Sequence, residues 1–197
     1  MADPGYIVDG VLTDGEGWVA VASTTLDADT ASITFTSTDD GQVGDFSQYM
    51  DLVAICYLRG AQTGAGYEFL WVYCNGDSTA GNYEAQHFVS DGATDTAAAD
   101  NPLVVAYTVK SVTSPSTISA DIFGGAICHF FDVNSGKYKS SVSQGASDID
   151  GAGYVDMHVR TWKSQAAITS LLFRMENGDL SDESRIDLFG ILPRMVA

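Results

Sequence analysis

Basic side chains are scarce in this chain of 197 residues. Lysine and arginine together number 9 against 26 acidic residues, which gives a formal net charge of −17 at pH 7. Such a chain repels the phosphate groups of DNA and RNA, so we expect no nucleic-acid partner. The same repulsion acts at an anionic lipid surface, so we expect no membrane partner either.

The few bases are also unevenly placed. Residues 1–100 contain one basic side chain, Arg59, and sixteen acidic ones, whereas residues 101–197 contain eight basic and ten acidic side chains. One part of the molecule should therefore carry a strong negative field. That field suits a basic surface on a partner, and it equally serves solubility.

Long hydrophobic runs and leader-like segments are missing too. No window of about 18 apolar residues occurs, so we expect no membrane-spanning helix. The first residues, Met1–Gly5, have neither a basic flank nor an apolar stretch, so we expect no secretory signal peptide.

Cysteine is rare, and its count is odd. Cys56, Cys74 and Cys128 each lie within an apolar, strand-like run. Three cysteines do not close a disulfide framework. We therefore predict three buried, reduced thiols in a protein that folds in a reducing compartment.

The sequence motifs of common enzymes and metal sites are absent. There is no Gly-x-Ser-x-Gly, Cys-x-x-Cys or His-Glu-x-x-His, and the glycine-rich stretch 60–66 lacks the Lys-Ser/Thr ending of a phosphate-binding loop. Cys128 and His129 are neighbours, but adjacent strand residues point to opposite faces. We therefore predict a protein that is not an enzyme, with no catalytic residues, no cofactor and no metal site.

Three weaker possibilities remain open. Acidic turns supply oxygen ligands for calcium, although none has the spacing of a full calcium loop and Asp is also a turn former. These turns are Asp27-Ala28-Asp29, Asp39-Asp40, Asn75-Gly76-Asp77, Asp148-Ile149-Asp150, and Asp179 with Asp182. Two of the carboxylates Glu68, Glu84 and Glu176 would suffice for glycoside hydrolysis. Aromatic residues such as Trp71 suit a sugar-stacking platform, but at alternating strand positions we expect them in the core.

What the sequence does contain is the periodicity of β-strands. Apolar or alternating runs, separated by turns rich in Gly, Asp, Asn and Ser, recur along most of the chain. They predict strands over residues 18–21, 31–37, 51–59, 67–74, 83–89, 103–110, 118–123, 126–133, 137–142, 154–162, 168–176 and 185–192. Such a series of short strands predicts an all-β fold, an antiparallel β-sandwich or jelly roll.

The segments between the strands complete this organisation. Residues 45–50 predict one helical turn capped by Asp45, and residues 94–100 lack an amphipathic stripe and are predicted to be a loop. Residues 1–16 are rich in glycine and acidic residues and predict a short extended N-terminal arm that becomes ordered on a partner. The β-sandwich domain is therefore expected over residues 17–197.

Several of these stretches resemble a group of virion structural proteins of tailed bacteriophages. The similarity covers residues 33–37, 49–59 and 70–83, with a core motif of Asn75-Gly76-Asp77 followed by Asn82-Tyr83. Residues 167–171 and 188–191 fit the same pattern. Members of this group look like jelly-roll surface proteins that decorate heads or form parts of tail fibres, so the resemblance implies attachment rather than catalysis.

The resemblance and the composition lead to one functional expectation. We expect a capsid decoration or cement protein, located in the virion after assembly in a host cytoplasm, that binds the phage capsid or other virion proteins. Self-association is also expected, with a trimer as the simplest guess. The alternative is a tail or fibre component that contacts host-surface glycans, and a glycan-degrading enzyme is the least supported class.

Overall fold

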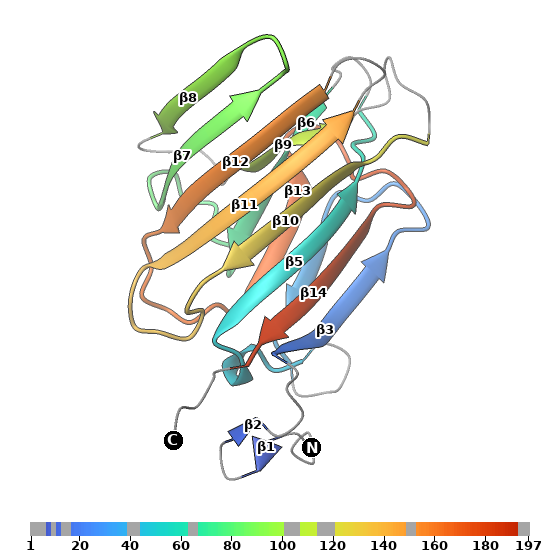
Figure 1. The fold of residues 1–197 in the computed structure, drawn as a ribbon. Coiled ribbons are helices and arrows are strands. Elements are labelled where there is room, and N and C mark those ends of the chain that lie inside the picture. The colour runs from blue at the N-terminus through green and yellow to red at the C-terminus, as the bar shows by residue number, and fades with distance from the viewer. Residues whose placement is uncertain are drawn as a thin grey trace.

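The structure is a computed structural model that describes residues 7–8, 11–12, 17–38, 44–62, 67–100, 107–113, 121–148 and 153–192. It is an antiparallel sandwich of two β-sheets (Figure 1). The larger sheet has eight strands, in the order β3 (Trp18–Thr25), β14 (Arg185–Ile191), β5 (Asp51–Leu58), β10 (Gly124–Phe130), β11 (Lys139–Asp148), β12 (Gly153–Trp162), β7 (Tyr83–Ser90) and β8 (Asp95–Asp100).

The smaller sheet lies behind the larger one in Figure 1. Its four strands are, in order, β4 (Ile33–Thr36), β13 (Ser170–Met175), β6 (Tyr67–Cys74) and β9 (Tyr107–Thr113). β9 packs against β10, β11 and β12 of the larger sheet. The all-β antiparallel sandwich that the sequence predicts is therefore confirmed.

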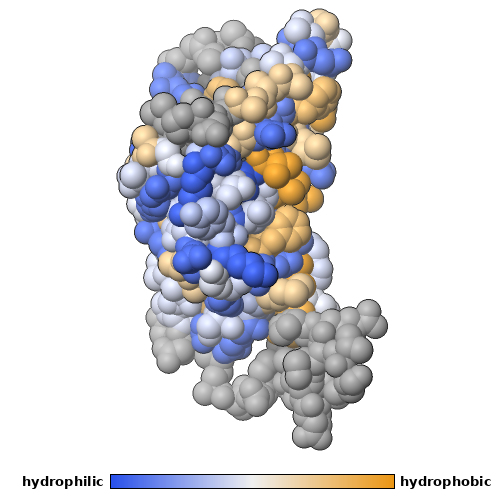
Figure 2. All heavy atoms as spheres, turned by 90° about the vertical axis from the view of Figure 1, so that its left-hand side faces the viewer, coloured by the Kyte–Doolittle hydropathy of each residue, from blue (hydrophilic) through white to orange (hydrophobic). Residues whose placement is uncertain are grey.

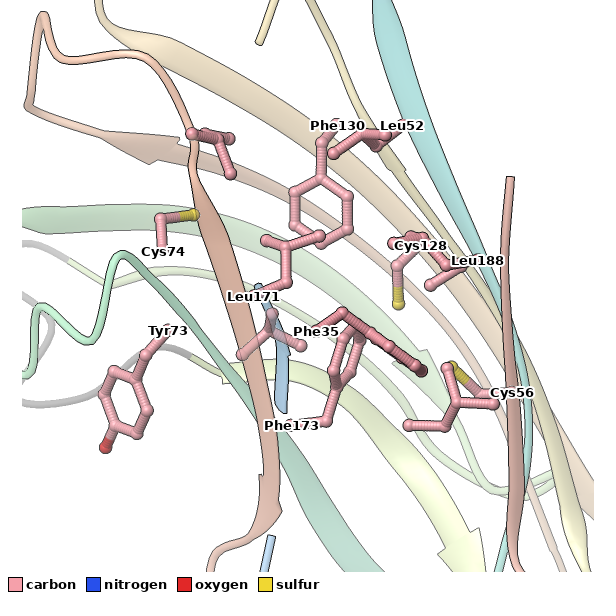
Figure 3. Packing of buried hydrophobic residues seen from close by; sticks show 14 of the residues in the cluster. Phe35, Leu52, Cys56, Tyr73, Cys74, Cys128, Phe130, Leu171, Phe173 and Leu188 are labelled. Atoms are coloured by element: carbon pink, nitrogen blue, oxygen red, sulfur yellow. The ribbon is translucent and has the colours of Figure 1, made fainter. Parts of the chain in front are cut away.

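The core fills the space between the two sheets. Side chains at alternate positions of β4, β5, β10, β13 and β14 point into it, as the period of two residues in a strand requires. Phe35 and Phe173 meet edge to face with ring centroids 6.0 Å apart, and both are buried. The three cysteines lie in this core as free thiols, and Cys56 and Cys128 point toward the same region between the sheets (Figure 3).

Most predicted strands are present, with shifted ends. Residues 51–59 and 67–74 correspond to β5 and β6, which lie inside their sheets as their continuous apolar character predicts. The helical turn also forms, because the Asp45 carboxylate accepts the Ser47 N–H and caps the 3-10 turn η1 (Phe46–Gln48).

Two predictions of local structure are wrong. Residues 94–100 were expected to be a loop, but Asp95–Asp100 form β8, because β7 offers an unpaired edge to which the segment adds as a strand. Residues 121–123 of the strand predicted over 118–123 are a turn that leads into β10; its first three residues lie outside the described part. The strand expected over 103–110 begins at Tyr107 among the described residues and extends to Thr113.

The expected N-terminal arm is described only in part. β1 (Ile7–Val8) and β2 (Val11–Leu12) pair with each other as a small separate sheet, and the rest of residues 1–16 lies outside the described residues. The sandwich itself begins at β3.

Candidate contact face

The outer face of the larger sheet carries exposed, large apolar side chains on four of five neighbouring strands. Their exposed fractions range from 36 % for Ile55 to 60 % for Val155. We call this set the contact face; its members are Ile55, Tyr57, Phe88, Ile127, Val155, Met157 and Val159. They come from β5, β10, β12 and β7, with β11 between them.

Strand register explains why these residues form one surface. Ile127 lies opposite Ile55 on β5 and opposite Gln144 on β11, and Gln144 in turn lies opposite Met157 on β12. Phe88 on β7 continues the same row. Residues that face one another across a ladder share a face, so the row crosses the sheet without interruption.

A shallow hollow of about 760 Å³ lies in the middle of this face. Its floor is made of small residues, because Gly125 pairs with Ala146, and their outer neighbours in the same row are Tyr57 and Val155. A side chain added at Gly125 would meet nothing within 4 Å. The hollow therefore exists because glycine and alanine occupy its centre and large residues surround it.

Charge is kept away from the centre of the face. Asp156 is the one acid among the described residues that line the hollow, and it is buried on the inner side of β12. At the margin, Arg185 contacts Asp187 with 3.0 Å between Nε and Oδ2. For a chain with a net charge of −17, a large neutral area is a distinct local feature.

The space-filling view shows the same segregation. Figure 2 looks onto the β7–β8 side of the molecule, and hydrophobic residues gather along the margin that belongs to the outer face of the larger sheet. Hydrophilic residues cover much of the described surface between the two sheets. The seven residues of the contact face therefore form one patch, whereas Trp18, Met50, Phe131 and Tyr138 are exposed outside it.

The inner side of β12 is polar where the outer side is apolar. Asp156, His158 and Arg160 alternate with Val155, Met157 and Val159, and all three polar residues are buried. Arg160 donates to the Val72 carbonyl on β6 at 2.7 Å and lies over the rings of Tyr83 and Phe130. The His158 ring stacks on His87, with centroids 5.2 Å apart.

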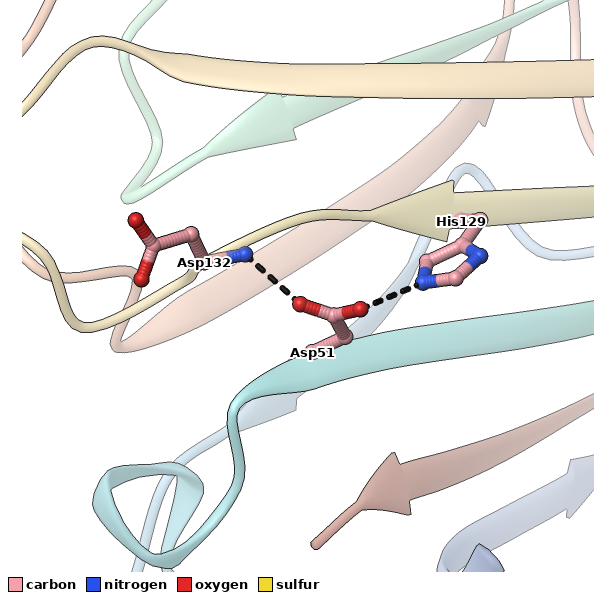
Figure 4. Close-up of polar contacts among 3 residues, drawn as sticks. All are labelled: Asp51, His129 and Asp132. Carbon is pink, nitrogen blue, oxygen red and sulfur yellow. Dashed lines mark hydrogen bonds and ion pairs between the residues drawn. The ribbon is translucent and has the colours of Figure 1, made fainter. Parts of the chain in front are cut away.

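A hydrogen-bonded group of residues lies at one end of the contact face. The Asp51 carboxylate bonds to His129 Nε2 at 2.8 Å and accepts the Asp132 backbone N–H at 2.8 Å (Figure 4). The His129 ring also stacks on Phe131, with centroids 4.0 Å apart. This group ties the start of β5 to the end of β10, which is a structural role.

The structure separates the residues of a possible thiol enzyme. His129 lies on the outer face, whereas Cys128 is buried inside the sandwich, as strand alternation predicts. A contact with the Cys128 thiol, together with burial, raises the pKa of Cys56 well above its ordinary value. Burial raises the pKa of Cys74 to about 11. Protonated thiols are poor nucleophiles, which argues against this role for Cys56 and Cys74, and all three cysteines are buried in the core.

None of Glu68, Glu84 and Glu176, the glutamates considered for glycoside hydrolysis, is among the described residues that line the hollow of the contact face. Glu68 is buried, and its Oε1 accepts the backbone and side-chain N–H groups of Asn177. Burial raises the pKa of Glu68. Glu84 pairs with Lys163 on the surface. These contacts fix loops and strand ends.

The acidic turns serve backbone hydrogen bonds. Asp29 accepts the Asp182 N–H, and Asp91 accepts the N–H groups of Ala93 and Thr94. Within the described part of the chain, no group of three or more His, Cys, Asp or Glu side chains is arranged to hold a metal ion. Residues 39–40 and 149–150 lie outside that part.

Trp71, which the sequence predicts in the core, is not one of its fully buried residues but is partly buried and packs against them. Trp71 points outward from the smaller sheet and is half-buried; Arg174 lies over its ring at 5.3 Å, and Tyr73 meets it edge to face. Inward positions of β6 are Glu68, Leu70, Val72 and Cys74. The strand is apolar on both faces, so its sequence did not reveal which side faces the core.

The Asn75-Gly76-Asp77 motif forms the turn after β6. Asn75 and Gly76 both have positive φ, of 52° and 66°, which these two residues tolerate. The Asp77 Oδ2 atom accepts from Trp162 Nε1 and from Asn82 Nδ2, each at 2.8 Å. The Tyr83 hydroxyl donates to the Asp77 carbonyl. The motif therefore connects the smaller sheet to β12 and β7 of the larger one.

Sequence reasoning missed the contact face. The alternation of Val155, Met157 and Val159 with polar residues was visible, and it marks an apolar side of β12, but it places that side in the core by default.

Among the described residues, no helix has the length and apolar character needed to cross a membrane.

Comparisons with known proteins do not assign a function to this chain. No protein-family model, no curated protein and no solved structure matches the chain.

Proposed function

We propose that this chain is a structural protein of a bacteriophage virion, a decoration protein that binds the capsid and stabilises it. The observation that carries the proposal is the contact face, a neutral apolar surface on an otherwise strongly acidic chain. The resemblance of the Asn75-Gly76-Asp77 region to phage virion proteins supplies the class of partner. The capsid subunits would cover the contact face, and the acidic remainder would face solvent.

The size of the face suits a protein partner. At ~200 Å² of full accessible surface for a large apolar side chain, its seven residues expose about 650 Å². The largest apolar patch on an ordinary monomer is roughly 300–600 Å², and one side of a standard interface is about 800 Å². The contact face therefore approaches one side of a specific interface.

The chemistry of the face favours protein over glycan. A sugar site needs aromatic rings together with several hydrogen-bonding groups, and the face is mainly aliphatic. Among the described residues that line the hollow, the polar groups on its outer side are the side chains of Gln144 and Arg185 and the hydroxyl of Tyr57. Aliphatic side chains on a nearly flat sheet bind by burial against a complementary apolar surface.

The proposal is tested on intact particles of the phage that encodes the chain. Quantitative mass spectrometry of purified virions would give its copy number, and electron cryomicroscopy would locate it. Hundreds of copies on the head are expected, whereas a few tens on the tail would favour the fibre alternative.

Binding is then tied to the contact face. Particles that lack the protein are mixed with the purified chain, and Met157→Asp, which places a charge on the face, should abolish rebinding. The matched control is Thr34→Asp, which adds the same charge at an exposed position of β4 on the smaller sheet. Equal binding by both variants, with both folded by circular dichroism, would disprove the assignment of the face.

A further inference from the structure

The four edge strands of the sandwich differ in how well they are protected. β4 has only four residues, the ladder between β3 and β14 contains a bulge, and β9 pairs with β6 through two register shifts. β8 has none of these features and pairs with β7 over six residues in unbroken register. Short strands, bulges and charged side chains are among the features by which proteins block edge-to-edge pairing; β8 has no bulge, and its two charges, Asp95 and Asp100, lie at its ends.

β8 is also exposed on both of its sides. Residues 95–99 are all exposed, so neither side of β8 is covered in the described structure. In Figure 1 the β7–β8 pair forms the outer margin of the larger sheet, and β9 of the smaller sheet packs against β10 to β12. The middle of the strand is Thr96 followed by three alanines, with no proline and no lysine.

The hydrogen-bond pattern shows which main-chain groups of β8 point away from β7. In the turn between the strands, the Asp91 N–H donates to the Thr94 carbonyl. Bonded and non-bonded pairs alternate along an antiparallel ladder, so Thr96, Ala98 and Asp100 bond to β7. The N–H and C=O groups of Asp95, Ala97 and Ala99 therefore point outward from the sheet.

We propose that β8 pairs with β8 of a second copy of this chain, antiparallel and two-fold symmetric about Ala97. In this register Ala97 faces its own copy, Asp95 faces Ala99, and Thr96 faces Ala98. The outward main-chain groups of Asp95, Ala97 and Ala99 then exchange hydrogen bonds with the same groups of the second copy. Under two-fold symmetry no second kind of edge is needed, because the outward N–H and C=O groups of β8 in one copy pair with the same groups in the other.

Side-chain size and the local placement of the acids suit a second copy as the occupant, although the net charge of the chain opposes association elsewhere on its surface. Two chains with a net charge of −17 repel each other, so they associate only where acids do not meet. In the register above, each Asp95 faces an alanine. Alanine side chains also let two such strands approach without steric conflict.

The pairing continues a surface that is already apolar. A hollow of about 470 Å³ beside β8 is lined by Phe88, Met157 and Val159 together with Ala97 and Ala99. Two-fold pairing of β8 brings this hollow next to its copy and joins the two larger sheets into one. The contact faces of both copies then lie on the same side of a single sheet.

The test measures the oligomeric state of the full chain by sedimentation velocity and light scattering. At roughly 100 µM, a dimer with a Kd of ~10 µM or tighter is largely assembled, and a dimer is the expected result. Ala97→Pro removes one outward N–H from each copy, and Ala97→Asp places two carboxylates opposite each other at the axis. Both should weaken the dimer by about tenfold or more.

The matched control is Ala97→Thr, which keeps the N–H and suits a strand, so it should remain dimeric. Hydrogen exchange supplies a second measurement: the Ala97 and Ala99 amides should be protected in the dimer and exchange rapidly in Ala97→Asp. A monomeric wild-type chain, or a dimer that both variants leave intact, would overturn the proposal. Because Met157→Asp tests capsid binding and Ala97→Asp tests self-pairing, either proposal can fail without the other.

Discussion

Replacing Asp77 by alanine should destabilise the fold by more than a typical surface substitution does, because its carboxylate accepts hydrogen bonds from three donors. Oδ2 accepts from Trp162 Nε1 and Asn82 Nδ2, and Oδ1 accepts the Thr79 N–H at 2.9 Å. Trp162 is buried, so its indole N–H loses its hydrogen-bond partner at a buried position when the carboxylate is removed. Asn82 and Thr79 lie nearer the surface, so water can replace part of the hydrogen bonding that their N–H groups lose.

The magnitude follows from these three bonds. An orphaned buried donor costs about 1–3 kcal/mol, and each of the more exposed donors loses about 0.5–1 kcal/mol. Asp77→Ala should therefore destabilise the fold by about 3 kcal/mol, which corresponds to a fall in Tm of roughly 6–12 °C for a chain of this size. Asp77→Asn should cost only about 1 kcal/mol, because its amide oxygen can still accept from Trp162 and Asn82.

The assay is denaturant unfolding followed by circular dichroism at pH 7, with Asp27→Ala as the control. Asp27 is an exposed acid in the loop after β3, so its replacement removes the same charge without these bonds. A double-mutant cycle with Trp162→Phe isolates the Asp77–Trp162 pair. The effect of a typical surface substitution on the free energy of unfolding is about 1 kcal/mol or less. If the free energies of unfolding of Asp77→Ala and Asp27→Ala differ by no more than this, the reasoning is wrong.

Acid supplies an independent check of the same contacts. Burial alone would raise the pKa of Asp77, but hydrogen bonds from Trp162, Thr79 and Asn82 outweigh it and lower the pKa below 3.8. An acid with a lowered folded-state pKa stabilises the fold above its unfolded pKa and loses that contribution as the pH falls through the folded value. The stability difference between wild type and Asp77→Ala should therefore shrink below about pH 3.8, the ordinary carboxylate range.

Two further predictions concern burial. Trp71→Ala should destabilise by about 1–2 kcal/mol, because the ring is half-buried outside the core, whereas Phe173→Ala in the core should cost about 3–5 kcal/mol; equal losses in denaturant unfolding would put Trp71 in the core. Glu68→Gln should raise the Tm at pH 7, because burial raises the pKa of Glu68 and so disfavours its charged form. The gain in Tm should vanish below pH 4.5, because Glu68 is then protonated in both the folded and the unfolded state. A Tm at pH 7 lower than that of the wild type would contradict this prediction.

The sequence reveals the sandwich because its strands carry their own signal. Ile33 and Phe35 alternate with threonines, and both are buried in β4 as that pattern predicts. β8 escaped detection because Thr-Ala-Ala-Ala has no preference for a strand, and only pairing with β7 makes it one. Strand formation at an edge is decided by the neighbouring strand more than by propensity.

The candidate site was harder to predict, because it depends on which side of a strand faces inward. On β12, burying Val155, Met157 and Val159 is the default for an isolated strand with one apolar side. The structure does the reverse and buries Asp156, His158 and Arg160. No local pattern in the sequence shows which side of β12 faces the core, because a shift of one residue in register exchanges its two sides.

Contacts with the smaller sheet explain how β12 keeps the less obvious orientation. Trp162 bonds to Asp77 after β6, and Arg160 bonds to the Val72 carbonyl within β6, so two inward side chains two residues apart are fixed to the same strand. A slip by one residue would break both bonds and leave the guanidinium in water. The alternation then places Val155, Met157 and Val159 outside, whatever their preference for burial.

This orientation connects the structural motif to the proposed function. Burying an arginine and exposing three large apolar side chains both work against the stability of an isolated chain. The apolar share of that penalty is recovered when a partner covers the contact face. The turn formed by Asn75-Gly76-Asp77 thus does more than join two strands: through Trp162 it holds β12 so that its apolar side faces outward. A variant that loosens the Asp77–Trp162 bond without unfolding the chain should therefore weaken partner binding as well as stability.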